Sequence, residues 1–67
     1  MSWFAEQRQN WIKEMLRVYG FINRNHVQKK FGVSTAQAAV DFRAVMARWP
    51  DLMEYDTNMK CYVEKRK

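Results

Sequence analysis

Residues 31–49 read FGVSTAQAAVDFRAVMARW, and they contain the end of one expected helix, a turn and the whole of a second helix. Gly32 can adopt the left-handed backbone conformation that a sharp helix exit requires. Ser34 can cap the second helix, because its hydroxyl accepts from free backbone N–H groups of the first turn. Pro50 stops that helix, since proline has no N–H to donate. A helix, a glycine turn and a capped helix together indicate a helix-turn-helix, whose second helix enters a DNA major groove.

The second helix, expected over residues 35–49, has one apolar face that should meet the core. Its apolar side chains recur at spacings of four, three and four, which places them on one side of a helix with 3.6 residues per turn. These side chains are Ala38, Phe42, Val45 and Trp49. Val33, just before the helix, is expected to fill the corner between the two helices of the motif.

The opposite face of this helix is built from small side chains, which is unusual for a surface that meets only water. It carries Ala36, Val40, Arg43 and Ala47, flanked by Thr35, Gln37, Ala39 and Ala44. Alanine, valine and threonine methyl groups can contact thymine methyls, and a glutamine amide can bond adenine with two hydrogen bonds. The face therefore suits a DNA groove. The alternative is that it packs on another protein chain.

Two helices are expected before this one, and the later of them is the first helix of the motif. The first covers about residues 3–19, with Ser2 as its cap and Gly20 at its end, and the second covers about residues 24–31, with Asn23 as its cap. The positions expected to face inward are Phe4, Arg8, Ile12, Met15, Leu16, Tyr19, Val27 and Phe31.

The first helix also carries a second, mixed stripe that includes Trp3, Trp11, Glu14 and Val18. A small domain needs one buried face per helix, so these aromatic side chains need another partner. We expect them to pack beneath the hairpin described next. Otherwise they form a dimer seam, because exposed aromatic clusters mark interfaces.

A β-hairpin is expected over about residues 52–63, with strands at 52–55 and 60–63 and a turn at Asp56, Thr57 and Asn58. The expected register pairs Tyr55 with Lys60, Met53 with Tyr62 and Glu54 with Cys61. Phe21 and Ile22 form a further short extended piece. The whole pattern predicts a mainly α fold with a small β-hairpin, a winged helix-turn-helix of three helices plus a wing, as a single domain over residues 1–67.

The charge of the chain favours a polyanionic partner. There are 12 Lys and Arg against 7 Asp and Glu, which gives a formal net charge of +5. A field of this sign attracts nucleic acid first and an anionic membrane surface second, although such charge can also serve solubility alone. No apolar run is long enough for a membrane span and no secretory signal is visible, so we expect a cytoplasmic protein.

Catalytic and metal-binding chemistry is not expected. The chain has one cysteine and one histidine, which gives neither a disulfide framework nor a metal-ligand cluster. Cys61 is expected to be a small buried side chain, and His26 a surface or capping histidine. Without a nucleophile–base pair or a glycine-rich phosphate loop, we expect no enzyme and no cofactor.

The segments GFINRNHVQKKFGVSTAQAAVDFRAV and WPDLMEYDTNMKCYV together resemble the N-terminal winged helix-turn-helix of WYL-domain transcriptional regulators, which include repressors of bacterial phage-defence loci. They are more distantly similar to DeoR-type winged helices. The matching positions are Gly20, Ile22, Asn23, Arg24, Phe31, Gly32, Val33, Ser34, Gln37, Ala38, Asp41, Pro50, Tyr55, Asp56, Lys60 and Tyr62. The resemblance implies sequence-specific operator binding by a dimer, usually with repression of a promoter.

Two departures from that family pattern matter. Ala36 and Ala39 stand where the family often has Pro and Ser, so base preference does not carry over. The WYL and dimerisation regions are missing, so the chain is either an excised N-terminal domain or a complete small regulator, for example one borne by a phage or plasmid.

The predicted function is a sequence-specific DNA-binding transcriptional regulator, a repressor, whose partner is double-stranded DNA and which acts as a homodimer or cooperative oligomer. Three side chains are expected to read bases: Thr35, Gln37 and Val40. Five are expected to hold the DNA backbone: Arg24, Lys30, Ser34 and Arg43 on phosphates, and Lys60 as the anchor of the wing. The alternative is a protein-interaction adaptor that docks a partner on the small apolar face of the helix.

Overall fold

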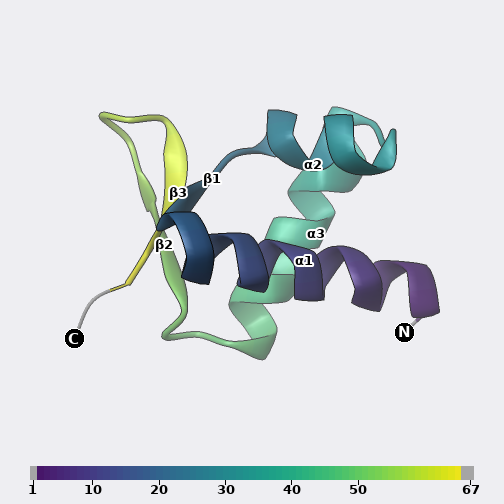
Figure 1. Ribbon diagram of the computed structural model, residues 1–67, viewed down its shortest axis with the longest axis horizontal. Coiled ribbons are helices and arrows are strands. Elements are labelled where there is room, and N and C mark those ends of the chain that lie inside the picture. Colours follow the sequence, from purple (N-terminus) through teal and green to yellow (C-terminus); the bar gives the residue numbers. More distant parts are fainter. Residues whose placement is uncertain (1, 66–67) are drawn as a thin grey trace.

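The computed structural model describes residues 2–65 and contains three helices and three strands. Their order is α1 (Trp3–Tyr19), β1 (Phe21–Ile22), α2 (Arg24–Phe31), α3 (Thr35–Arg48), β2 (Met53–Asp56) and β3 (Cys61–Glu64). Figure 1 shows α1 crossing in front of α3, with α2 beyond one end of α3 and the sheet beside the C-terminal end of α1. The predicted fold, a winged helix-turn-helix of three helices and a wing, is confirmed.

Each helix begins at a side-chain cap that the sequence offers. The side chains of Ser2, Asn23 and Ser34 accept hydrogen bonds from the backbone N–H three residues further on, at 3.2, 3.1 and 3.1 Å. Two helices end on glycines with positive φ, 82° at Gly20 and 67° at Gly32. These caps are local, and they place every helix boundary within one residue of the expected position.

The core forms where α1, α3 and the sheet meet. Its buried members are Ile12, Leu16, Ile22, Val27, Ala38, Phe42, Val45 and Met53, and Phe31, Val33 and Trp49 pack against them partly buried. The expected apolar face of α3 is therefore confirmed. α3 ends one residue earlier than expected, at Arg48, with Trp49 as its C-cap before Pro50.

The buried side of α1 includes Ile12 and Leu16, as expected, but it differs from the expected side at the two ends of the helix. Gln9 is 2% exposed, whereas Phe4 and Tyr19, which we expected to face inward, are 69% and 66% exposed. The fully buried row of α1 runs through Gln9, Ile12 and Leu16, and Arg48 of α3 donates a hydrogen bond to the Gln9 side-chain oxygen at 3.0 Å. A polar side chain can be buried there because this bond satisfies it.

The three strands form an antiparallel sheet in the order β1-β3-β2. The observed register pairs Tyr55 with Tyr62 and Met53 with Glu64, so the register predicted from the sequence is wrong by two residues. The turn is longer than expected: the Asp56 side chain accepts from the N–H groups of Asn58 and Met59, and Lys60 lies outside the strand with φ of 55°.

A shift of two residues keeps each side chain on the expected side of the sheet. Met53 is still buried, and the Tyr62 ring stacks on Phe42 of α3 with centroids 4.1 Å apart and planes 6° apart. Cys61 is also buried, as predicted. The wing is thus fixed to α3 by an aromatic pair.

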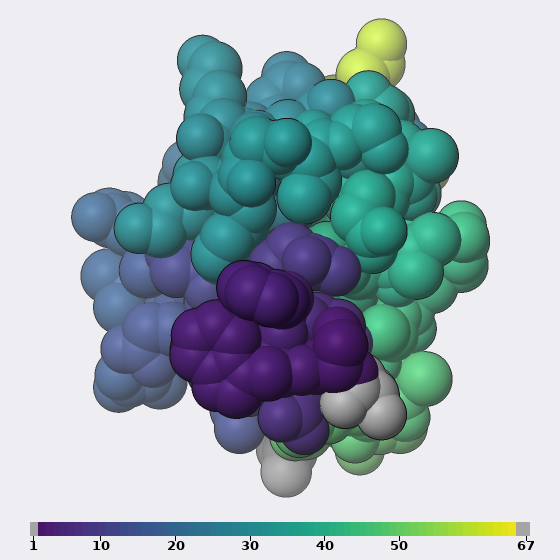
Figure 2. Space-filling view, turned by 90° about the vertical axis from the view of Figure 1, so that its right-hand side faces the viewer, coloured from purple at the N-terminus to yellow at the C-terminus, as the bar shows by residue number. Residues whose placement is uncertain are grey.

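The second stripe of α1 does not pack beneath the hairpin, so that expectation is wrong. Trp11 instead contacts Phe31 of α2 edge to face, with centroids 5.5 Å apart. Trp3 and Phe4 contact each other and remain 64% and 69% exposed. In Figure 2 the N-terminal end of α1, in purple, protrudes below the α2–α3 region, in teal. Among residues 2–65, none of the helices combines the length and hydropathy that a membrane span requires.

Replacement of Gly32 tests whether the turn between α2 and α3 depends on its left-handed backbone. A Cβ at this position would meet nothing within 4 Å, so the cost of Gly32→Ala is conformational rather than steric crowding by neighbours. We expect the free energy of unfolding to fall by about 1–2 kcal/mol, measured by urea denaturation. Gly32→Asn should cost less, because asparagine tolerates this conformation. Equal stability of the alanine variant and the parent would contradict this assignment.

Candidate nucleic-acid interface

The face of α3 opposite the core is left uncovered by the rest of the described chain. Ala36, Val40, Arg43 and Ala47 are all exposed, and Val40, the largest apolar residue among them, is 47% exposed. The hairpin lies beside this helix and contacts its buried side through Phe42. The sequence prediction that the small side chains of α3 face outward is therefore confirmed, and the face is available to a partner.

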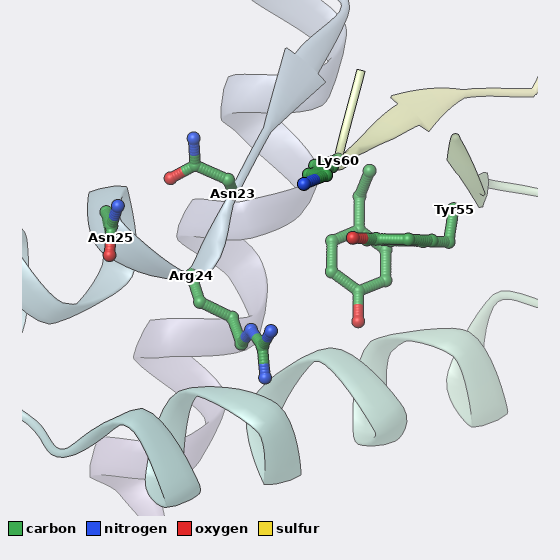
Figure 3. A pocket seen from close by; sticks show the side chains of 6 residues that line it. Asn23, Arg24, Asn25, Tyr55 and Lys60 are labelled. Carbon is green, nitrogen blue, oxygen red and sulfur yellow. The ribbon is translucent and has the colours of Figure 1, made fainter. Parts of the chain in front are cut away.

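A cationic pocket lies beside α3, between the start of α2 and the hairpin. Its volume is about 130 Å³, and it is lined by Asn23, Arg24, Asn25, Tyr55, Lys60 and Tyr62. Figure 3 shows Arg24 extending from α2 toward α3, while Tyr55 and Lys60 enter the same space from the wing. Within residues 2–65 neither Arg24 nor Lys60 forms an ion pair. Two uncompensated cations beside a helix N-terminus form a suitable environment for a phosphate group.

The wing brings Lys60 to this pocket through an uncommon backbone conformation. Among the described residues other than glycine, Lys60 alone has a positive φ, 55°. Lys60 comes directly after the turn, which the Asp56 side chain stabilises by accepting hydrogen bonds from two backbone N–H groups. Sequence reasoning named Arg24 and Lys60 as separate phosphate contacts. The structure brings them together at one pocket.

Gln37 lies at the edge of the uncovered face and is half-buried. Its side-chain Nε2 donates to Asp41 Oδ1 at 3.1 Å, and Asp41 Oδ2 accepts from Arg8 Nε of α1 at 2.7 Å. The Gln37 amide is therefore held by a bond to Asp41, and its carbonyl oxygen and its second Nε2 hydrogen are left for further bonds. The two-bond contact with adenine expected from the sequence would use this oxygen and the second hydrogen of Nε2, with the first hydrogen kept on Asp41.

The remaining predicted residues stay separate from the pocket. Ser34 is exposed, with its hydroxyl oxygen accepting from the Gln37 N–H as a cap, while Lys30 and Arg43 are exposed on α2 and α3. Thr35 is exposed at the start of α3, and its hydroxyl oxygen accepts from Gln28 Nε2 at 2.8 Å. Gln28 was not singled out from the sequence, because nothing in the residue pattern marks an exposed hydrogen bond between two helices.

His26 has a structural role in the cap of α2. Its Nδ1 accepts from the Asn23 backbone N–H at 3.1 Å, while the Asn23 side chain accepts from the His26 N–H. This reciprocal capping box confirms the expectation of a capping histidine. Within residues 2–65 there is no cluster of three or more side chains that could hold a metal ion.

Three helices, a glycine turn before α3 and an antiparallel wing define a winged helix-turn-helix domain. Residues 5–67 match the family model of the BrxR transcriptional regulator winged helix-turn-helix domain, and the chain belongs to this family. It is a family of transcriptional regulators rather than of enzymes. The resemblance noted in the sequence, to winged helices of phage-defence regulators, is thereby confirmed.

The chain is also similar to two curated Escherichia coli proteins, one of them from strain KTE188, each named DNA-binding transcriptional repressor CapW. Each is 37% identical over 60 residues, which is 90% of this chain and 20% of the relative. The chain thus spans about a fifth of the length of these relatives.

The ion pair between Arg8 and Asp41 should be important for stability. The Asp41 side chain is 2% exposed and that of Arg8 15%, so Arg8→Met leaves a buried carboxylate without its counter-charge. We expect the free energy of unfolding to fall by about 3 kcal/mol, measured by chemical denaturation.

Arg17→Met is the matched control for Arg8→Met, because it removes an arginine from the same helix. Arg17 pairs with Glu14, whose carboxylate raises the pKa of the Arg17 guanidinium, but both side chains are exposed to water. We expect the control to unfold at the parent denaturant concentration, since exposed pairs contribute little. Equal losses in the two variants would show that burial does not distinguish these pairs.

Proposed function

We propose that this chain is the sequence-specific double-stranded DNA-binding domain of a transcriptional repressor. In this proposal α3 lies in the major groove and the wing contacts the DNA backbone or minor groove. The observation that carries the proposal is the uncovered face of small side chains on α3, which lies beside a pocket whose two cations form no ion pair within residues 2–65. The net charge of +5 and the names of the curated relatives support the same function. A regulator of this kind would act in the cytoplasm.

The proposed contacts divide by chemistry. Arg24 and Lys60 hold one phosphate in their shared pocket, and Ser34, Lys30 and Arg43 contact neighbouring phosphates. Thr35 and Val40 meet base edges, and Gln37 offers its carbonyl oxygen while its Nε2 stays on Asp41. Phosphate contacts supply affinity without sequence information, whereas the groove face supplies selectivity.

Salt titration and two substitutions test this division. With a few phosphates neutralised per copy, the logarithm of affinity should fall against log salt with a slope of roughly −3 to −5, measured by fluorescence anisotropy. Lys60→Gln should weaken binding to every sequence alike and make the slope shallower by about 1. Gln37→Ala should instead relax selection at one base pair, detected by sequencing DNA bound from a random pool.

Arg17→Gln is the control for loss of one positive charge, because Arg17 is an exposed residue of α1 that is paired with Glu14. It should leave both the slope and the selected sequence as in the parent. Identical binding to a selected site and to its shuffled version, together with no footprint, would refute sequence-specific recognition.

We also propose that operator DNA holds two or more copies of the chain, as a homodimer or a cooperative oligomer. The surface of one copy is too small for tight specific binding to DNA, whereas two copies match a near-palindromic site. The exposed Trp3–Phe4 pair supports an apolar contact between copies. Sedimentation equilibrium should therefore show a mass that rises with concentration or on addition of palindromic DNA. Trp3→Ser should reduce this rise, and a monomer under all conditions would refute the proposal.

A protein-interaction adaptor remains the second candidate, because Val40 and the neighbouring alanines form an apolar surface on α3. Salt separates the two candidates. Binding to DNA should weaken steeply as salt increases, whereas an apolar protein contact should persist at high salt.

A further inference from the structure

A hydrogen bond joins the two helices of the helix-turn-helix at the edge of the uncovered face. Gln28 of α2 donates from Nε2 to the hydroxyl oxygen of Thr35, the first residue of α3, at 2.8 Å. The backbone of Gln28 is held as well, because its carbonyl oxygen accepts from the Gly32 N–H at 2.7 Å in the helix exit. Gln28 is half-buried, while Thr35 is exposed. The helix exit therefore holds the backbone of the donor residue, and the acceptor residue lies at the surface.

The direction of this bond determines what Thr35 offers to a partner. An amide nitrogen carries hydrogens and cannot accept, so the Thr35 oxygen must be the acceptor. The single hydroxyl hydrogen of Thr35 must then point away from Gln28. Because Thr35 is exposed at the N-terminal end of α3, this hydrogen is available as a donor to a ligand. The Thr35 oxygen keeps a second lone pair, but without Gln28 the hydroxyl could rotate freely and its hydrogen would have no fixed direction.

We propose that Gln28 is a positioning residue that presents the Thr35 hydroxyl as a hydrogen-bond donor, and so sets base selection at one position of the DNA site. The inference rests on the proposed function, since it requires α3 to lie in the major groove. There, guanine offers two acceptors, N7 and O6, and thymine offers O4, whereas cytosine offers an amino donor. The domain should therefore select guanine or thymine over cytosine on the strand that Thr35 contacts.

Glu at position 28 reverses the bond and gives the sharpest test. A carboxylate only accepts, so in Gln28→Glu the Thr35 hydroxyl donates toward position 28 and turns its lone pairs to the groove. The preferred base at that position should change toward cytosine or adenine, whose amino groups donate. Gln28→Met removes the bond at similar side-chain length, and Thr35→Val removes the hydroxyl at similar shape. Each should lower the preference at that position by about 3- to 10-fold, and the double variant should lower it no further.

The measurement is the base preference of the 67-residue chain and its variants, obtained by sequencing DNA selected from a random pool and confirmed by titration of matched sites. Thermal unfolding of each variant is measured in parallel. A bond that only ties α2 to α3 would lower stability, or affinity for all sequences equally, and leave the base ratio unchanged.

Two failures can be told apart. If the parent selects a site and Thr35→Val alters one position, but Gln28→Met and Gln28→Glu keep the parent ratio there, the inference about Gln28 is overturned and the proposed function stands. If the parent selects no sequence at all, the proposed function fails, and the inference fails with it.

Discussion

The stack of Phe42 on Tyr62 is the contact on which the placement of the interface depends. Phe42 is completely buried at the centre of α3, and its ring lies parallel to that of Tyr62 in β3. Removal of a large aromatic side chain from a core lowers the free energy of unfolding by several kcal/mol, which is roughly what its burial contributes. The same contact orients α3 and the wing together, because one partner belongs to each. The uncovered face of α3 and the pocket at Lys60 are therefore positioned by one aromatic pair.

A domain of 67 residues has a small core, and side-chain hydrogen bonds at its border supplement it. α1 and α3 are joined by Arg8 with Asp41 and by Arg48 with Gln9, in addition to their apolar contact. Every buried side-chain nitrogen or oxygen among the described residues has a hydrogen-bond partner. These bonds lie on the side of α3 that faces α1. The polar groups of α3 that serve stability are thus separated from the face that remains free.

The parts of this fold that depend on local chemistry could be predicted from the sequence, and those that depend on distant partners could not. Ser34, Asn23 and Gly32 act within one turn of their own positions, so the residue types were sufficient. The predicted hairpin register was wrong because the Asp56 side chain accepts from two backbone N–H groups and the turn is longer. The types of the turn residues alone do not reveal this length.

The candidate site shows the same division. The outward face of α3 follows from periodicity, and the bond from Gln37 to Asp41 joins residues one helical turn apart, but Arg8, the other partner of Asp41, lies 33 residues away in the chain. Asp41 itself was a visible signal, because an acidic residue on the buried side of a helix requires a partner. The shared pocket of Arg24 and Lys60 likewise depends on how the wing packs, and therefore on the register that local reasoning missed.

The distribution of charge around α3 separates two tasks that many recognition helices combine. The small side chains of its free face bring little charge, with Arg43 the one cation among its exposed central members, while Arg24 and Lys60 lie on other elements at its border. A cation on the reading face adds attraction to any duplex, whatever its sequence. In the proposed complex, cations at the border would allow affinity to be adjusted by the wing and α2 without altering the groups proposed to contact bases. Under the proposed function, neutral hydroxyl, methyl and amide groups would therefore carry the selectivity of the domain, and their orientation would matter more than their charge.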